Sequence, residues 1–467
     1  MATQNAESTS SRTEIPSSEN SMTLAPSPTS VDNNLDTASI SSASQSASKT
    51  PNPEHEQTAK DIIKLMQQAD NDFPLEADRL QCPPPREDRY GYLKNYGEKE
   101  VMYQTRGAAR TMRTKPKWFF ALDLYNSAPV LPRLMSTIIE TMTFLGPENC
   151  HLSLVEGRSG DGTYEVLHAL EPLITTLGAS FTLQTNETDP HENDESDYKE
   201  RIVRLAHLRN LALSPLTLSP QSFHTETTVL FINDIAVCAT DILELAHQRL
   251  FQSAHLVCAM DWNANGHNFY DSWIGRTMRG DLFIWQADSS DFSHHAQTLF
   301  WNDRDLKTRR ENGLSSQVFS CWNGMVAFTA QPLWDWVGAE KKVVAGGKTV
   351  AVVKDGDVEQ GVRFRSAREG ECHFGEPVYF AKDLRKRGYD RVAVVGSVNV
   401  GYSDSESREA KERWGRVEDW TSEVWLDEMV EQGFEQKIVW SDEPPKKLVC
   451  VEIWGAEYQD VPWDQGL

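Results

Sequence analysis

The stretch 227–262 constrains the fold of this chain more than any other part of the sequence. An apolar, strand-like run ends in Asn233-Asp234, a helix pattern follows, and a second apolar run ends in Asp261-Trp262. Two buried strands with a helix between them form an α/β unit, and ligands of open α/β sheets bind outside the carboxyl ends of the strands. Both aspartates are therefore predicted to lie at a binding site.

The part of the chain before this unit alternates between strand and helix patterns. Strands are predicted at 118–126, 151–156 and 181–185, and helices at 127–146, 163–178 and 199–213. This alternation indicates a parallel sheet with right-handed crossovers, so the fold class is α/β. Asp161 is placed to cap the second helix and Gly178 to end it, while Asp241 and Glu244 stand at capping-box spacing.

Shorter patterns follow the opening unit. We predict strands at 281–285 and 391–402, an apolar run at 321–328, a hairpin at 342–353, and a loop and helix at 368–390. Composition then sets the domain boundaries. Residues 1–80 are a disordered Ser/Thr/Pro-rich tail with a short helix at 59–70, residues 81–404 are the α/β domain, and residues 405–467 are an acidic C-terminal extension packed on the core.

Charge narrows the class of partner. The formal net charge is −23, from 69 acidic against 46 basic residues, which predicts no nucleic-acid partner because phosphate binding needs a basic surface. No transmembrane segment is visible, because no apolar run reaches about 18 residues. The first residues do not resemble a signal peptide, and one glycosylation sequon begins at Asn186.

The seven cysteines include no CxxC pair, so a zinc or redox motif is not indicated. Cys238, Cys258 and Cys450 lie in apolar runs and are predicted to be buried thiols. Because the count is odd, at least one thiol stays free if the others pair.

Asp234 is the strongest candidate for chemistry. An aspartate at the end of a buried strand can hold Mg²⁺ or Mn²⁺ against a pyrophosphate, and the alternative is a helix-capping or turn residue. Asp261-Trp262 combines an acceptor group with an aromatic face, which suits a sugar, and the alternative is a turn aspartate beside a buried tryptophan. The surface would be extended by Tyr270, Asp271, Trp273 and Trp322.

Two further places carry candidate groups. Glu371 and His373 lie in a glycine-bounded loop and could bind metal or acceptor, although a lone loop histidine is often only solvated. Arg209-Asn210, at a helix end, could contact a nucleotide or its phosphates, although Arg209 is also expected to be one of the more exposed side chains of that helix. The common dehydrogenase, ATPase, hydrolase and metalloprotease motifs are missing.

Taken in order, the blocks VLFINDI, DILEL, CAMDW, FYDSWIGRTMRGD, CWNGMVAF and AKDLRKRGYDRVAVVGSVNVGY resemble the fungal capsule-associated α-1,3-mannosyltransferase family, glycosyltransferase family 69. The resemblance spans roughly residues 117–403. It implies a GT-A-like, Rossmann-type mixed sheet flanked by helices. It also implies transfer of mannose from GDP-mannose to a mannose-containing glycan acceptor, with an α-1,3 linkage, retention of configuration and Mn²⁺ (or Mg²⁺) as cofactor.

Combined with the residues above, the resemblance gives a set of expected roles. Catalysis is assigned to Asp261 and Glu371, donor binding to Arg209, Asn210 and Asn233, acceptor binding to Trp262, Trp322 and Asn323, and metal binding to Asp234 and His373. The metal would neutralise charge on the departing GDP. The acceptor would then attack on the same face of the mannose, or a carboxylate, Asp261 or Glu371, would form an intermediate first.

Alternatives stay open. The donor could be another nucleotide sugar, such as UDP-glucose or UDP-xylose, or the chain could be a non-catalytic scaffold or regulator of polysaccharide synthesis or export. Members of the family are typically Golgi proteins with an N-terminal membrane anchor, which this sequence does not show. The start of the sequence is therefore altered, or a partner holds the protein, or the protein is not in the Golgi.

Overall fold

The computed structural model describes residues 52–53, 55–57, 59–60, 80–96, 115–185, 198–285, 295–334, 342–345, 348–352, 361–451 and 458–466. Most of the predicted N-terminal tail, with residues 61–70 of its predicted helix, and the sequon at Asn186 lie outside these residues. None of the helices in the described part of the chain is both long and apolar enough to cross a lipid bilayer.

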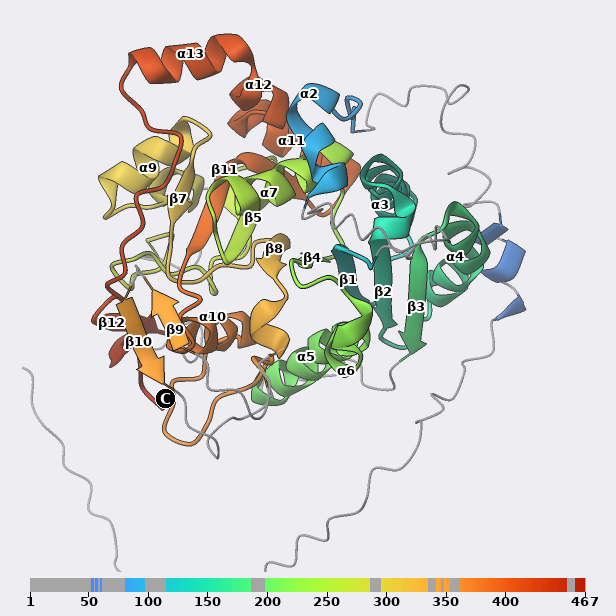
Figure 1. Ribbon diagram of the computed structural model, residues 1–467, viewed down its shortest axis with the longest axis horizontal. Helices are drawn as coiled ribbons and strands as arrows, with labels where there is room; N and C mark the ends of the chain where they lie inside the picture. The colour runs from blue at the N-terminus through green and yellow to red at the C-terminus, as the bar shows by residue number, and fades with distance from the viewer. Residues whose placement is uncertain are drawn as a thin grey trace, which may run out of the picture. The chain divides into compact units, whose positions relative to one another are not determined.

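In the described residues, a mixed sheet of nine strands forms the centre of the fold (Figure 1). Its strands are β1 (Trp118–Leu124), β2 (Cys150–Glu156), β3 (Ser180–Thr185), β4 (Thr228–Ile232), β5 (Leu256–Asn263), β6 (Asn268–Phe269), β7 (Ser315–Gln317), β8 (Met325–Thr329) and β11 (Val392–Gly401). The order is β3-β2-β1-β4-β8-β5-β11-β7, with β6 paired to β5. Neighbours from β3 to β4 run parallel, as do β5 and β11, whereas β8 is antiparallel to both β4 and β5. The predicted α/β class with a mixed sheet is confirmed.

The helices follow the strands in the order that the sequence predicts. They are α2 (Glu87–Tyr90), α3 (Leu131–Leu145), α4 (Thr163–Leu177), α5 (Tyr198–Ala212), α6 (Ser214–Leu218), α7 (Ala239–Phe251), α8 (His295–Thr298), α9 (Arg304–Glu311), α10 (Glu376–Lys386), α11 (Asp404–Trp414), α12 (Val417–Thr421) and α13 (Glu423–Glu431). Short 3₁₀ helices are η1 (Gly91–Asn95), η2 (Pro147–Asn149), η4 (Pro220–Ser222) and η6 (Gln331–Trp334). The predicted hairpin is present as β9 (Lys342–Ala345) and β10 (Lys348–Val352), and β12 (Lys447–Cys450) pairs with β13 (Gln459–Pro462).

The central strands of the sheet are buried on both faces, which explains why they appear as continuous apolar runs. Side chains alternate between the faces along a strand. On β1, Phe119 and Ala121 pack in one cluster with residues of α5 and α10, while Phe120 and Leu122 pack in another with residues of α3, α4 and α7.

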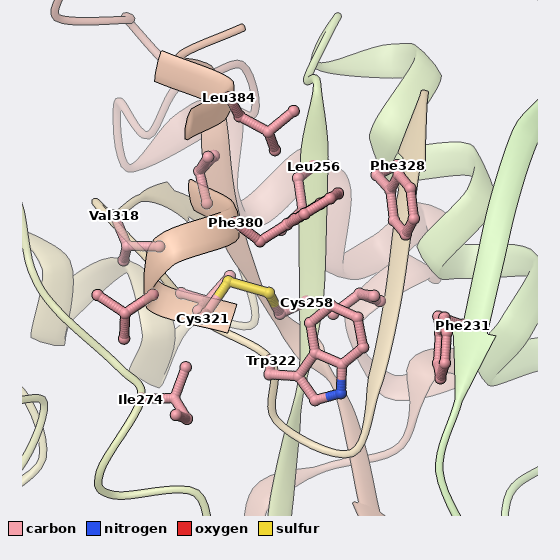
Figure 2. Packing of buried hydrophobic residues seen from close by; sticks show 14 of the residues in the cluster. Phe231, Leu256, Cys258, Ile274, Val318, Cys321, Trp322, Phe328, Phe380 and Leu384 are labelled. Atoms are coloured by element: carbon pink, nitrogen blue, oxygen red, sulfur yellow. A yellow bond between two sulfur atoms is a disulfide. The ribbon is translucent and has the colours of Figure 1, made fainter. Parts of the chain in front are cut away.

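Figure 2 shows part of the first cluster, where Trp322 and Phe380 lie beside the disulfide between Cys258 and Cys321, and Phe231 lies on the far side of Trp322. The rings of Phe231 and Trp322 meet edge to face with centroids 5.2 Å apart. The turn that carries Trp322 is thereby held against the end of β4.

All seven cysteines lie in the described residues, and six of them form disulfides. The pairs are Cys82–Cys238, Cys258–Cys321 and Cys372–Cys450. The prediction of free thiols at Cys238, Cys258 and Cys450 is therefore wrong, although all three are buried. Their partners stand 156, 63 and 78 residues away, so local apolar character could not reveal them. The one free thiol is Cys150, also buried.

Two local predictions need correction. Residues 281–285 form no strand and share only an isolated bridge from Leu282 to Arg276, because this apolar run enters the core as an irregular segment. The capping box of α7 pairs Asp241 with Cys238, whose N–H donates to the carboxylate at 2.8 Å. Glu244 instead accepts hydrogen bonds from Arg89.

The ends of α4 agree better with the sequence. Asp161 Oδ1 accepts a hydrogen bond from the Thr163 N–H at 3.1 Å. The N-cap position itself, directly before the helix, is occupied by Gly162. Gly178 ends the helix with a φ of 104°, as predicted.

Helix α11 packs on the core of the fold. Lys411 of α11 is buried, and its Nζ lies 2.6 Å from Asp241 Oδ1 on α7 and 2.7 Å from the carbonyl oxygen of Asn399 on β11. A buried charge that lost its partner would be strongly destabilising, so this contact ties α11 to the sheet.

Candidate active site

The carboxyl ends of β1, β4 and β5 meet at one edge of the sheet. Because β8 runs antiparallel between β4 and β5, its first residues lie at the same edge. Ile232, the last residue of β4, pairs with Met325, the first of β8. The turn before β8 is therefore brought beside the polar residues that follow β4. The sequence does not indicate this contact, because the two segments are far apart along the chain.

Asn233 and Asp234 follow β4 at this edge. The Asn233 N–H donates to the Gly324 carbonyl at 2.9 Å, and its side-chain Oδ1 accepts a hydrogen bond from Trp322 Nε1 at 3.2 Å. Asp234 is exposed. The indole thus fixes the amide of Asn233, while the carboxylate of Asp234 reaches solvent.

Asp261 lies inside the sheet edge and is fully buried, with 0% of its surface exposed. Its Oδ2 accepts a hydrogen bond from the Tyr402 hydroxyl at 2.7 Å, and its Oδ1 accepts one from the Asp271 N–H at 3.3 Å. Burial raises the pKa of the Asp261 carboxyl well above its usual range, and the charge of Asp271 adds to the shift. The aspartate predicted to be catalytic therefore has no surface open to a substrate.

Asp271 is the half-buried partner of this pair. Its Oδ2 accepts a hydrogen bond from the Asn323 N–H at 2.8 Å, and burial raises its pKa. Asn323 itself is buried, and its Nδ2 donates to the Ala259 carbonyl at 2.9 Å. The role of Asn323 in the structure is thus to hold the turn and Asp271 in place.

Arg209 extends from α5 into the same region and is 7% exposed, so the expectation of an exposed side chain is wrong. Its Nε lies 2.8 Å from Glu376 Oε1, and its guanidinium carbon lies 4.2 Å from the centre of the Trp322 ring. The charges of Arg209 and Glu376 both affect Asp123 on β1. Burial raises the pKa of Asp123 to about 6, the positive charge of Arg209 opposes this rise, and the negative charge of Glu376 adds to it. Arg209 thus pairs with Glu376 and lies within electrostatic range of Asp123.

The side chains of Asn210 and Trp262 are both engaged in contacts within the protein. The Asn210 side chain donates to the Phe364 carbonyl at 2.8 Å and accepts from the Phe364 N–H at 3.0 Å. Trp262 is 0% exposed, stacks on Trp414 with ring centroids 5.0 Å apart, and donates from Nε1 to Asn399 Oδ1 at 2.9 Å. Neither ring face of Trp262 is open to a sugar, so we leave it out of the acceptor site.

Glu371 lies in a different network. Its carboxylate accepts hydrogen bonds from Arg365 Nη1 at 2.6 Å, Lys382 Nζ at 3.2 Å and the Arg368 N–H at 2.8 Å, and its side chain is fully buried. None of these bonds leads to the residues at the sheet edge. Glu371 stabilises the segment before α10 in this structure, and the catalytic role predicted for it has no geometric support.

The metal prediction joined Asp234 with His373, which is half-buried. Within the described residues, no three side chains of His, Cys, Asp and Glu lie close enough to hold a metal ion together. Mg²⁺ and Mn²⁺ often take only one or two carboxylates and complete their shell with substrate phosphates and water. The exposed carboxylate of Asp234 fits that kind of site, and His373 is not needed for it.

The sequence interpretation missed Asp123, Glu376 and Tyr402. Asp123 stands one residue before the end of β1, beside β4, so the same strand-end rule that singled out Asp234 could have found it. Tyr402 directly follows β11, the next strand to β5. No signal in the sequence pointed to the pairing of Glu376 with Arg209.

The fold and the site define a Rossmann-type α/β protein with carboxylates and one buried arginine at the carboxyl edge of its sheet. Residues 117–383 match the family described as cryptococcal mannosyltransferase 1, and the chain belongs to that family. It is 32% identical over 333 residues to the α-1,3-mannosyltransferase CMT1 of Cryptococcus neoformans. The match covers 68% of this chain and 64% of that protein, so the chain spans less than two thirds of its relative.

Two solved structures have weaker similarity. One is S. aureus TarS 1–349, with 12% identity, a TM-score of 0.32, and coverage of 62% of this chain and 60% of that chain. The other is the mannosyltransferase PcManGT of Pyrobaculum calidifontis in complex with GDP-Man and Mn²⁺, with 13% identity, a TM-score of 0.32, and coverage of 74% and 68%. At these TM-scores, neither supports an argument about this chain.

Proposed function

We propose that the chain is a GT-A-like glycosyltransferase that moves mannose from GDP-mannose to a mannose-containing glycan and forms an α-1,3 linkage with retention of configuration. The observation that carries the proposal is the exposed carboxylate of Asp234 at the carboxyl end of β4, in a member of this family. Ligands of α/β sheets bind at that edge.

The donor would lie along this edge. Asp234 is the protein ligand for Mn²⁺ or Mg²⁺, and the bound ion would supply Lewis-acid stabilisation of the diphosphate leaving group. Asn233, fixed by Trp322, lies next to that ligand. Arg209 lies at the same edge, but it is buried and its Nε is paired with Glu376, so we assign it to holding Trp322, and through it Asn233, rather than to contact with the phosphates.

Of the two routes to retention, we favour attack by the acceptor on the same face of the mannose. A covalent intermediate needs a carboxylate that can touch the sugar. Asp261 is fully buried, and the side chain of Glu371 is fully buried as well. Neither carboxylate can touch the sugar in this structure, so neither can serve as that nucleophile.

We also infer that the protein folds in an oxidising compartment, which agrees with the Golgi or secretory location typical of the family. Three disulfides link distant parts of the described chain. Structural disulfides form and persist in secretory compartments and are rare where thiols are kept reduced.

The test is donor turnover by purified protein with Mn²⁺, with Mg²⁺ and with chelator, using GDP-mannose, UDP-glucose and UDP-xylose in parallel. Of the three nucleotide sugars, we expect only GDP-mannose to be turned over. In Asp234→Ala the rate of GDP release should fall roughly 100-fold or more, while thermal unfolding stays unchanged. The matched control is Asp305→Asn, an exposed aspartate on α9. Turnover of a UDP-sugar would change the donor, and wild-type turnover in Asp234→Ala would remove the assignment. No turnover of any donor would favour the scaffold alternative.

A further inference from the structure

Two neighbouring pairs in this site combine an aromatic ring with a carboxylate. In Asp261-Trp262, both residues are 0% exposed. In Tyr270-Asp271, the tyrosine is 53% exposed and the aspartate is half-buried. A ring can carry the C–H face of a sugar only if one of its own faces is open. The pair that can meet a ligand is therefore the second one.

Backbone contacts hold Tyr270-Asp271 at the edge of the sheet. After β6 the chain returns over the end of β5, where the Tyr270 N–H donates to the Asp261 carbonyl at 3.1 Å. The Asp271 carboxylate accepts from the Asn323 N–H at 2.8 Å. The two side chains are thus anchored to the ends of β5 and β8 instead of projecting from a free loop.

Tyr402 supports the exposed ring from beneath. The rings of Tyr270 and Tyr402 have centroids 4.5 Å apart and are inclined at 52°. The Tyr402 hydroxyl donates to the buried Asp261 Oδ2 at 2.7 Å. Since that bond fixes the ring of Tyr402, it also fixes the surface on which Tyr270 rests.

Tyr270 also lies within electrostatic range of Asp234, the residue assigned to the metal. Burial raises the pKa of the Tyr270 hydroxyl, and the nearby charges of Asp261, Asp234 and Asp271 raise it further. Asp234 is therefore within electrostatic range of this ring. A sugar stacked on Tyr270 would adjoin the place assigned to the donor diphosphate.

We propose that Tyr270 and Asp271 bind the acceptor sugar, with the ring of Tyr270 under its C–H face and the Asp271 carboxylate accepting from a hydroxyl. Asp261 is a positioning residue that acts through Tyr402. The proposal rests on the proposed function for the identity of the sugar, a mannoside. Tyr270-Asp271 thereby replaces Asp261-Trp262 as the pair that contacts the sugar. The chemical reason is the same for both pairs: a hydrogen-bond acceptor next to an aromatic face suits a sugar.

The first experiment separates acceptor binding from donor chemistry. The probe is an α-linked mannobiose, whose binding is followed by calorimetry and whose use as acceptor is followed by product formation. Tyr270→Ala should weaken mannobiose binding about tenfold, a change of about 1.4 kcal/mol. Its hydrolysis of GDP-mannose is measured in parallel, so that a change in acceptor binding is distinguished from a change at the donor site. Asp305→Asn is again the control.

The second experiment tests the positioning role. Tyr402→Phe removes one hydroxyl and should raise the KM for mannobiose by a larger factor than it lowers the kcat of transfer. If Tyr402 acts through Tyr270, its substitution should add nothing in a Tyr270→Ala background. Asp271→Asn should lower transfer about 100-fold if its charge faces the reacting sugar. Thermal unfolding of each variant reports folding separately.

The outcomes distinguish this inference from the proposed function. If wild type hydrolyses GDP-mannose but Tyr270→Ala binds mannobiose as well as wild type, the inference is overturned and the proposed function stands. If wild type hydrolyses no donor but binds mannobiose, and Tyr270→Ala loses that binding, the inference stands and the proposed function is overturned. Additive effects of Tyr402→Phe and Tyr270→Ala would contradict the positioning role.

Discussion

Nε of Arg209 lies 2.8 Å from Oε1 of Glu376, and both side chains are almost fully buried. The pair joins α5 to the first turn of α10, two helices that are distant in sequence. The guanidinium also lies against Trp322, whose indole holds Asn233. The helices on one face of the sheet are thereby connected to the turn that shapes the site.

Glu376→Gln should destabilise the protein by about 3–5 kcal/mol, because it leaves the buried charge of Arg209 without its carboxylate. Urea unfolding measures this loss. The double variant Arg209→Met with Glu376→Gln removes the uncompensated charge and should be more stable than Glu376→Gln alone. A single-variant cost below about 1 kcal/mol, the range of exposed ion pairs, would show that the pair is not desolvated in solution.

Gly324→Ala should disturb the site through contact with Asp261. Gly324 has a φ of 77°, and an added Cβ would lie 3.2 Å from the Asp261 Cβ. The backbone strain alone costs about 1–3 kcal/mol. Gly178→Ala is the matched control, because its φ is 104° but no atom lies within 4 Å of the added Cβ.

The difference between these two variants reports the packing around Asp261. Gly324→Ala should unfold at lower urea concentration than Gly178→Ala and should also lose transfer activity, which Gly178→Ala should keep. Equal stability losses in the two variants would mean that Asp261 can move aside at no cost.

The sequence was most informative where one apolar run forms one strand. The run at 228–232 coincides with β4, and the strand-end rule placed Asp234 at the carboxyl edge, where it is exposed. A strand and the charged residue that follows it can be predicted in this way, because both are read from a few consecutive residues. The same reasoning gave the order of strands and helices up to β5.

The sequence could not show which aromatic–acidic pair faces solvent. β5 continues beyond its apolar run to Asn263, so Asp261 and Trp262 pair with Val400 and Gly401 of β11 inside the sheet. Their burial depends on β11, a strand more than a hundred residues later. Long-range pairing also explains the errors about cysteines, since no local pattern distinguishes a buried thiol from half of a disulfide.

Thiol titration should find one free cysteine in the unfolded, unreduced protein and seven after reduction, because three pairs have Cα–Cα distances of 5.3, 6.2 and 6.0 Å. The native protein should react slowly, since Cys150 is buried. Cys82→Ser should cost about 2–5 kcal/mol, because its disulfide closes a long loop to Cys238. Three or more thiols before reduction would contradict the pairing.

The stability of the fold should fall as the pH drops from about 6.5 to about 4, in part through His151. Burial lowers the pKa of this imidazole to about 4, and it lies stacked on Phe119 with ring centroids 5.0 Å apart. In the unfolded chain its pKa is about 6.5. Between these values the unfolded state binds a proton that the folded state does not, so acid favours unfolding.

The expected slope from His151 is about 1.4 kcal/mol of unfolding free energy per pH unit within this window, with no further change from this group below pH 4. His151→Gln can keep a hydrogen bond to Ser180 but does not titrate, so urea unfolding between pH 4 and pH 7 should show a shallower dependence than wild type. His207→Gln, which removes an exposed imidazole from α5, provides the reference slope. A His151→Gln slope equal to that reference would mean that His151 is protonated in the folded protein at mildly acidic pH.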